Sequence, residues 1–350
     1  MINDWLMANG NDIIKYHITK DIERLDNLKD NDEVEYWFDQ FMKHYNAGCI
    51  ENVHGSHDYR IENILGKLWL LGLNSQVQWF DEKMKYILDF LEQHTKREQD
   101  NANTFNRIYQ NHDYETVLSC FLPWLGYGNS EAVNRIVNKR IQYIYDFIQE
   151  GRFNIYMDAQ GLKGLKKEWK SYIIDTDLYS DGNIKLPSVH DIILFSGVYD
   201  GLPVEKKSQV DAVIEWILND KYQELKNRYG YFYVEDDSYH AKSILRNLRL
   251  QNEDMLLNGK SDLQSLLLNL YIMSHFKSGI ESNWFKMCSS FLEQYKDSDE
   301  IYEYPVYMLV EKTDSYFTDG GHMNLGLKKS KMYRKVLSQF WNEMIYSSKF

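Results

Sequence analysis

The chain has 350 residues, of which 43% are hydrophobic, 26% charged and 15% aromatic, and its formal net charge is −12. This charge argues against the broad basic face of a nucleic-acid-binding protein and disfavours binding to an anionic membrane surface. No uncharged run of about 18 apolar residues occurs, so the sequence predicts no membrane span.

The cysteines are few and widely spaced, at Cys49, Cys120 and Cys288. This spacing favours neither a disulfide framework nor a cysteine metal site. The first residues include acids and lack the basic segment and apolar core of a signal peptide. We therefore expect a reduced cytoplasmic setting, no cofactor and no bound metal. The oligomeric state is left open.

Apolar residues recur at helical spacing along almost the whole chain, and two kinds of helix alternate. After an amphipathic pair at 12–25 and 33–46, helices that are apolar on nearly all sides are expected at 57–73, 113–127, 188–199 and 261–276. Helices with a single apolar stripe are expected at 76–94, 130–150, 206–219, 283–295 and 331–346.

A helix that is apolar all round is buried, whereas a striped helix has one face in water. The alternation therefore predicts an all-α protein with an inner and an outer helix layer, an α/α toroid of about five to six helical hairpins. An open α-solenoid is the alternative, but the repeat is longer and less regular than solenoid repeats. We expect a single domain, 1–350, with long insert loops near 151–187 and 221–260. Long loops in a compact domain are often functional.

Three stretches carry a resemblance to a known family. They are WLMANGNDIIKYHITKDI from Trp5, LPSVHDIILFSGVYDG from Leu186 and SYFTDGGHMNLGLKK from Ser315. They resemble stretches of bacterial prenyltransferase and squalene cyclase-like proteins of the terpenoid cyclase superfamily. The resemblance implies an α/α toroid. The DxDD, DDxxD and zinc motifs of those enzymes are absent here, so their chemistry does not follow from it.

His-Asp pairs begin three of the apolar runs. An Asp in the first helical turn accepts backbone N–H bonds, so each pair is explained most simply as a helix start. In a toroid, however, the N-termini of the inner helices gather at one mouth. Imidazoles and carboxylates collected there suit acid–base catalysis or a metal site. The candidate catalytic residues are His57, Asp58, His112, Asp113, His190 and Asp191.

Further side chains are candidates for binding a ligand at the same mouth. Glu62 shares a helical face with Asp58, a run of aromatic and acidic residues follows Tyr229 and suits a lid, and a Gly-Gly turn precedes His322. Ordinary loop packing is the alternative for each. The candidate ligand-binding residues are His54, Tyr59, Glu62, Tyr231, Tyr233, Asp236, Asp237, Tyr239, His240 and His322.

Several functions fit this pattern. One is an enzyme that binds a small apolar or saccharide-like ligand in a central aromatic cavity. It would be a non-standard cyclase or transferase, or a glycan hydrolase or lyase that uses cavity His, Asp and Tyr. Such an enzyme predicts at least two cavity groups with shifted pKa values. The other is a non-enzymatic binding or interaction scaffold, with acids only at helix starts. The chain lacks GxSxG, P-loop and GxGxxG motifs, which disfavours a serine hydrolase and a nucleotide site.

Overall fold

The computed structural model describes residues 2–48, 50, 53–100, 114–179, 184–233, 241–243, 246–327 and 332–346. Some of the predicted site residues lie outside these ranges, namely His112, Asp113, Asp236, Asp237, Tyr239 and His240. Their roles stay predictions.

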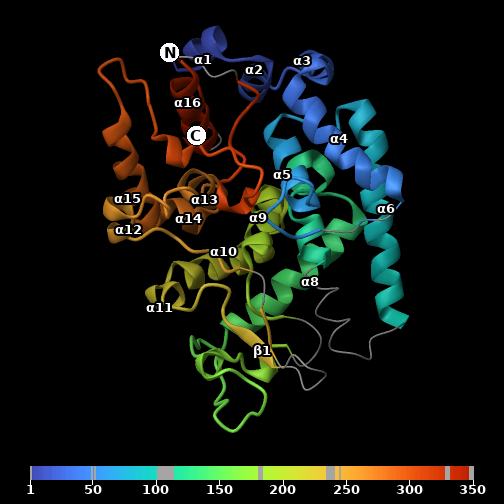
Figure 1. Ribbon diagram of the computed structural model, residues 1–350, viewed down its shortest axis with the longest axis vertical. Helices are drawn as coiled ribbons and strands as arrows, with labels where there is room; N and C mark the ends of the chain where they lie inside the picture. Colours follow the sequence, from blue (N-terminus) through green and yellow to red (C-terminus); the bar gives the residue numbers. More distant parts are fainter. Residues whose placement is uncertain are drawn as a thin grey trace.

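The described part of the chain is mostly helical, which confirms the all-α class (Figure 1). The first helices are α1 (Ile2–Asn9), α2 (Asp12–Thr19), α3 (Glu23–Asp26), α4 (Asp32–Ala47), α5 (Ile61–Leu70), α6 (Gln78–Asp100) and α8 (Glu131–Ile148). The later ones are α9 (Val189–Val198), α10 (Val204–Leu218), α11 (Asp220–Gln223), α12 (Glu253–Asn258), α13 (Leu266–Met273), α14 (Lys277–Glu281), α15 (Asn283–Leu292) and α16 (Tyr333–Tyr346). A π-helical turn spans Pro123–Tyr127.

Two of the predicted helix starts have different outcomes. At α9, Ser188 is the N-cap, and its side chain and that of Asp191 exchange bonds with each other's backbone N–H in a capping box. The predicted start at His57-Asp58 is wrong, because α5 begins only at Ile61 and its N-cap residue makes no side-chain cap bond. The Asp58 carboxylate instead accepts a hydrogen bond from the Tyr36 hydroxyl.

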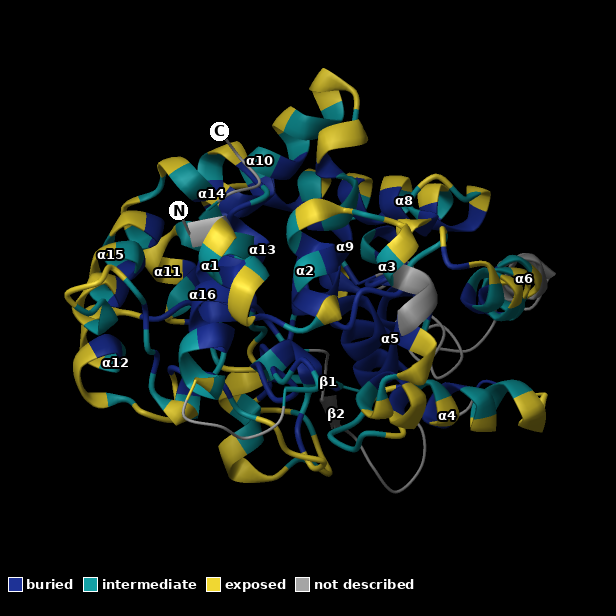
Figure 2. Cartoon of the chain, turned by 90° about the horizontal axis from the view of Figure 1, so that it is seen from above, coloured by how far each residue is buried: buried dark blue, intermediate teal, exposed yellow. Residues whose placement is uncertain are grey.

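Three of the four helices predicted to be apolar all round, α5, α9 and α13, form the interior, and residues 115–123 of the fourth are buried as well. Every residue of α5 and α13 is buried, and so is α9 from Val189 to Ser196. Helices such as α4, α8, α10 and α15 bury one side only, and they surround the interior helices in Figure 2.

Contacts between the interior elements run in a closed circle. Helix α5 packs on the turn Pro123–Tyr127, the turn on α9, α9 on α13, α13 on α16, α16 on α1 and α1 on α2. The circle closes where His17 Nε2 of α2 donates a hydrogen bond of 2.9 Å to the Leu70 carbonyl of α5. Elements from both ends of the chain therefore complete one helical body.

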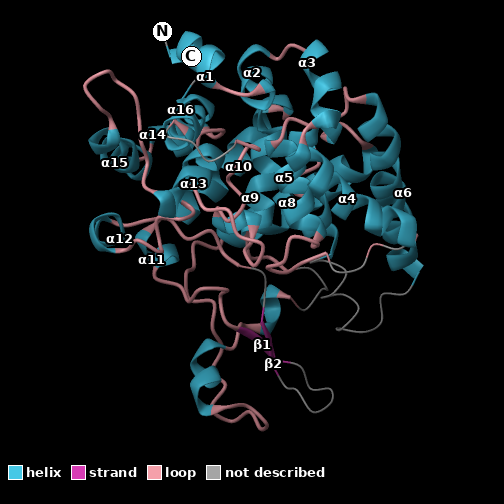
Figure 3. Ribbon diagram, turned by 45° about the horizontal axis from the view of Figure 1, so that its top comes forward, coloured by secondary structure: helices cyan, strands magenta, loops and turns pink. Residues whose placement is uncertain are grey.

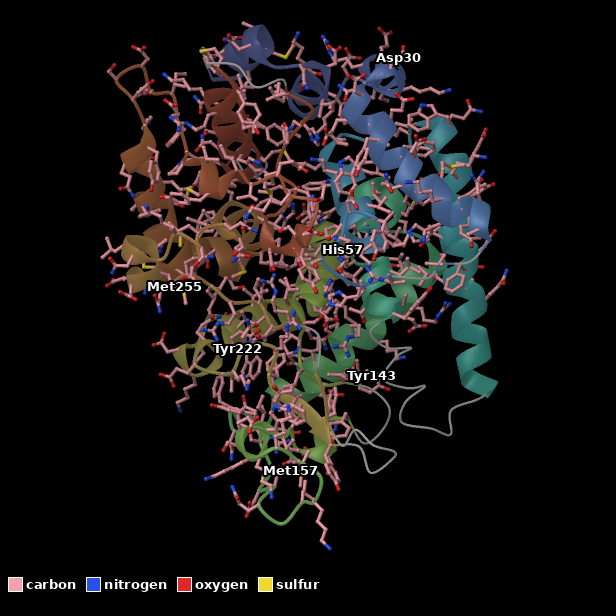
Figure 4. The ribbon with its side chains drawn as sticks, viewed as in Figure 1. Asp30, His57, Tyr143, Met157, Tyr222 and Met255 are labelled. Atoms are coloured by element: carbon pink, nitrogen blue, oxygen red, sulfur yellow. The ribbon has the colours of Figure 1, made fainter. Side chains whose placement is uncertain are left out.

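The two predicted insert loops associate with each other. Strands β1 (Tyr231–Tyr233) and β2 (Ala241–Ser243) pair antiparallel, and the Ile174 N–H donates to the Tyr231 carbonyl at 2.9 Å. These strands lie in an arm that projects from the helical body (Figure 3), and Met157 lies in the same arm in Figure 4. The described part of the second loop thus packs on the first.

Aromatic rings pack on one another between the interior helices. The Trp69 ring lies 4.3 Å from that of Trp124 and 5.3 Å from that of Tyr271, centroid to centroid. Phe317 reaches in from the segment before α16 and contacts Phe121 at 5.2 Å. A Cβ at Gly66 would lie 2.6 Å from Phe317 Cδ1, so only glycine permits this approach.

We predict that Gly66→Ala lowers the free energy of unfolding by about 1–3 kcal/mol, the usual cost of overpacking a core. The added methyl group must push Phe317 or α5 out of place. Urea denaturation measures the change. Gly161→Ala is the matched control, because a Cβ at Gly161 meets no heavy atom within 4 Å. Equal losses in the two variants would contradict the prediction.

Candidate functional site

The site is built around Glu62, a carboxylate with 0% exposure in the first turn of α5. One carboxylate oxygen accepts from His54 Nδ1 and from the Gly55 N–H, each at 2.7 Å. The other accepts from His190 Nε2 of α9, also at 2.7 Å. Glu62 therefore joins the loop before α5 to the start of α9.

The loop before α5 is held over the helix end by hydrogen bonds between the Asn63 side chain and backbone groups. The Asn63 side-chain amide donates to the carbonyls of Gly55 at 2.9 Å and His57 at 2.8 Å. Its oxygen accepts from the Phe317 N–H at 2.8 Å. His57 lies near the middle of the molecule in Figure 4. The start of α5, the loop and the segment at Phe317 are thus fixed relative to one another.

The electrostatics of the cluster keep Glu62 ionised. Burial by itself raises the pKa of this carboxyl, but hydrogen bonds from His190 and His54 and the charge of both rings lower it to about 2. Burial lowers the pKa of His190, while its bond to Glu62 acts in the opposite direction. Both Glu62 and His190 thus have shifted pKa values, but only His190 lines the neighbouring recess.

The three side chains also form a donor set of the kind that binds a divalent metal. The ligating atoms of His54, Glu62 and His190 lie within 4.8 Å of one another, and two imidazoles with one carboxylate suit zinc. A metal-bound histidine usually donates its other N–H to an acceptor. His190 Nδ1 is buried and has no partner among the described residues. The nearby Arg246 also adds positive charge. Both features favour hydrogen bonding within the trio over metal binding.

A recess and a larger pocket open beside the cluster. His54 and His190 line the recess together with Arg228, Arg246 and Tyr316. The adjoining pocket has a volume of about 350 Å³ and shares Arg246 and Asp319 with the recess. Its other polar lining residues are Asn227, Arg249, Gln251, Ser261, Asp262, Gln264 and Ser265.

The ends of the interior helices explain this meeting of distant residues. The Val189 N–H at the start of α9 donates to the Arg246 carbonyl at 2.8 Å, and Arg246 Nη2 donates to the Thr318 carbonyl at 2.8 Å. The Gln264 amide, just before α13, donates to the Asp319 carbonyl at 3.1 Å. The N-terminal ends of α5, α9 and α13 therefore face the same two segments, around 246 and 315–322.

The other candidates in the first His-Asp-Tyr stretch, His57, Asp58 and Tyr59, make their contacts on the surface side of the loop before α5. His57 is partly exposed, its Nδ1 lies 2.5 Å from Asp314 Oδ1, and its ring stacks on Tyr59 at 5.4 Å. Neither these residues nor Asp58 lines the recess. The structure therefore brings His54 and His190 together and leaves His57 outside.

The contacts of Asp191 indicate a structural role. It is buried, its carboxylate pairs with Arg140 of α8 at 2.7 Å and 3.1 Å, and it accepts from the Ser188 N–H at 2.7 Å. The Arg140 guanidinium also donates to the carbonyls of Ile184 and Leu186. A carboxylate so fully bonded serves to join α8 to α9.

The remaining predicted residues lie away from the recess. His322 is buried, with Nε2 2.9 Å from the Ser315 carbonyl oxygen and Nδ1 3.3 Å from Glu311 Oε1. Tyr231 belongs to the arm, where its ring packs 4.9 Å from Trp169, and Tyr233 follows in the same strand. They support the protein scaffold around the site.

Sequence reasoning missed the recess residues Arg228, Arg246 and Asp319. Tyr316 and Asp319 lie in the stretch SYFTDGGHMNLGLKK, which was singled out for its family resemblance and for the Gly-Gly turn before His322, not for these two residues. The arginines lie in polar loops without any motif, so their spacing offered no signal.

No protein-family model, curated protein or solved structure matches the chain. Any assignment of function therefore rests on the geometry and chemistry of the site. Among the described helices, none combines the length and the apolar character needed to cross a bilayer.

We predict that Asp191→Asn lowers the free energy of unfolding by roughly 3–5 kcal/mol, because it leaves the buried Arg140 charge uncompensated. Chemical denaturation measures the loss. Asp200→Asn, at an exposed position after α9, serves as the control and should change little. An Asp191 variant of wild-type stability would argue against the structural role.

We predict that the cluster of His54, Glu62 and His190 makes the free energy of unfolding fall at acidic pH. The Glu62 pKa is about 2 in the folded chain and 4.5 ordinarily. The stabilisation, roughly 3 kcal/mol at about 1.4 kcal/mol per pKa unit, is present above pH 4.5 and lost as pH falls toward 2. The lowered pKa of His190 acts in the same sense, because the unfolded chain takes up a proton that the folded chain refuses.

Unfolding free energies measured from pH 7 to pH 3 check this prediction. Glu62→Gln should be less stable than the wild type at pH 7 and should lose less stability between pH 4.5 and pH 3. Parallel curves for the two proteins would show that Glu62 is not the titrating group.

Proposed function

We propose that the helical body is an α/α toroid. The alternation of buried and half-buried helices supports this, and so does the closed circle of contacts from α5 round to α2. An open α-solenoid would leave its first and last helices far apart, whereas α1 contacts α16 here. Helices α1 and α16 also lie side by side in Figure 1.

We infer that the mouth at the start of α5 and α9 is an acid–base catalytic site. The observation that carries the proposal is the buried Glu62 carboxylate, which is bonded to His54 and to His190 at 2.7 Å. A carboxylate that accepts a bond from one ring nitrogen orients an imidazole and stabilises its protonated form. His54 is the natural proton carrier, because its side chain is 39% exposed and lines the recess, whereas that of His190 is 1% exposed.

The neighbouring pocket favours a polar, acidic ligand over an apolar one. Its lining is rich in amide, hydroxyl and charged groups. Across the pocket and the recess, the described lining residues include three arginines, Arg228, Arg246 and Arg249, against two aspartates, Asp262 and Asp319. In a chain of net charge −12, this local excess of positive charge suits a carboxylate-bearing saccharide.

Elimination fits these groups better than hydrolysis. Glycoside hydrolysis usually needs two carboxyl groups facing the sugar. Glu62 is buried and bonded to both histidines, and Asp319 pairs with Arg246. In the proposed elimination, His54 takes the proton from the carbon next to the sugar carboxylate. The electron pair of the broken C–H bond then forms a carbon–carbon double bond. The bond to the leaving oxygen breaks, and the Tyr316 hydroxyl supplies the proton to that oxygen. An arginine of the mouth neutralises the carboxylate.

The test incubates the protein with polygalacturonate, alginate or hyaluronate and follows the ultraviolet absorbance of the new double bond. We expect turnover on one of these polymers and a loss of about 100-fold or more in His54→Gln, the usual range for removing a general base. His44→Gln is the matched control, since His44 lies outside the recess. His57→Gln should retain most activity, because His57 does not line the recess.

Binding of a polymer without turnover would favour the non-enzymatic scaffold over the enzyme. Absence of both binding and turnover on all three polymers would contradict the proposed ligand class. A loss of activity in His57→Gln as large as in His54→Gln would return the catalytic role to the His-Asp pair.

A further inference from the structure

A second pocket of about 330 Å³ lies at the other end of α5. Trp69 and Trp124 form its aromatic floor together with His17, and Asn74 and Gln76 belong to its polar rim. Trp69 follows Glu62 by seven residues, which corresponds to about 10 Å along a helix. The pocket is therefore separate from the acid–base cluster, and its volume lies within the range of small-molecule sites, which begins at about 300 Å³.

The aromatic rings that line the pocket are held in place by their neighbours. The Trp124 indole N–H donates to Ser196 Oγ at 3.1 Å, and the Trp69 ring packs on Trp124 and Tyr271. His17 packs edge-on against Trp69 at 6.4 Å and Phe340 at 5.3 Å. Preformed rings of this kind pack well against the C–H face of a sugar or another flat ring.

His17 adds an unused hydrogen-bond acceptor beside the floor. Burial and the nearby Lys20 lower its pKa to about 3, so the ring is neutral. Its Nε2–H is committed to the Leu70 carbonyl. Nδ1 is therefore an acceptor, and it is buried without a partner among the described residues. A buried acceptor left unsatisfied is unfavourable, and a ligand hydroxyl that donates to it would remove that cost.

The charges around the pocket disfavour a cationic ligand. No Asp or Glu occurs among the residues described as lining it, although acids outnumber bases in the chain by 52 to 40. Lys20, at the rim, is the one ionised side chain among the described lining residues, because the His17 ring is neutral. The rim otherwise offers amides and hydroxyls, which exchange hydrogen bonds with hydroxyl groups.

From these observations we propose that this pocket binds an uncharged saccharide ring. The ring packs on the indoles of Trp69 and Trp124, one hydroxyl donates to His17 Nδ1, and the Gln76 side chain bonds a hydroxyl that remains at the rim. The Asn74 amide is already bonded to Tyr16 and Gly72. The proposal is independent of the acid–base site, because no described residue lines both the pocket and the recess.

The experiment measures binding of maltose, cellobiose and indole to the full chain, by saturation-transfer NMR and by quenching of tryptophan fluorescence. We expect one of the disaccharides to bind better than indole. Gln76→Trp, an exposed rim position, should weaken that binding at least tenfold by filling the entrance. Gln78→Trp is the matched control, since Gln78 is exposed two residues further on and does not line the pocket.

His17→Phe keeps an aromatic ring but removes the acceptor, and it should also weaken disaccharide binding at least tenfold. If that variant unfolds, Gln76→Trp still decides the question. Tighter binding of indole than of either disaccharide would show an apolar site and overturn the proposal. So would absence of binding by the wild type, or equal binding by Gln76→Trp and Gln78→Trp. His54→Gln should bind the disaccharide normally, which separates this pocket from the catalytic proposal.

Discussion

Helix α5 buries two ionised side chains, Glu62 and Lys67, in a helix that has no exposed residue. An unpaired charge in such a place costs many kcal/mol, so the surrounding chain must provide compensating groups. Glu62 receives three hydrogen-bond donors at 2.7 Å. Lys67 pairs with Glu311 at 2.9 Å and Glu33 at 3.2 Å and also donates to two carbonyls.

The two charges draw different parts of the chain onto α5. Five residues of α-helix correspond to a rotation of about 140° between the side chains, so they point to different sides. The loop before α5 and the start of α9 gather at Glu62, whereas α4 and the segment from Glu311 to Asn324 gather at Lys67. The first group carries the proposed chemistry, and the second holds the segment that brings Tyr316 and Asp319 to the recess.

The parts of this arrangement that depend on local pattern were predictable from the sequence. Uniform apolarity indicated burial of α5, α9 and α13, and the Ser188–Asp191 spacing fits a helix start. Glu62, His54 and His190 were each candidates. The toroid hypothesis placed all three near one mouth, but the direct bonds between them were not predictable, because 128 residues separate His190 from Glu62. Asp58 resembles Asp191 in sequence, yet a tertiary bond to Tyr36 determines its role. Nothing near Lys67 reveals that three of its partners, Glu311 and the carbonyls of His322 and Asn324, lie more than 240 residues away.

The pairing of Lys67 has a consequence for how the chain folds. Its partner Glu311 is 244 residues away, and the Asn63 amide meets the Phe317 backbone across 254 residues. During synthesis, α5 is complete long before these partners exist, so its charges keep it hydrated until the last quarter of the chain arrives. Closure over such long sequence separations is slow. The N-terminal half is therefore a poor independent folding unit, and a chain cut before Glu311 should be degraded rather than accumulate as a smaller stable protein.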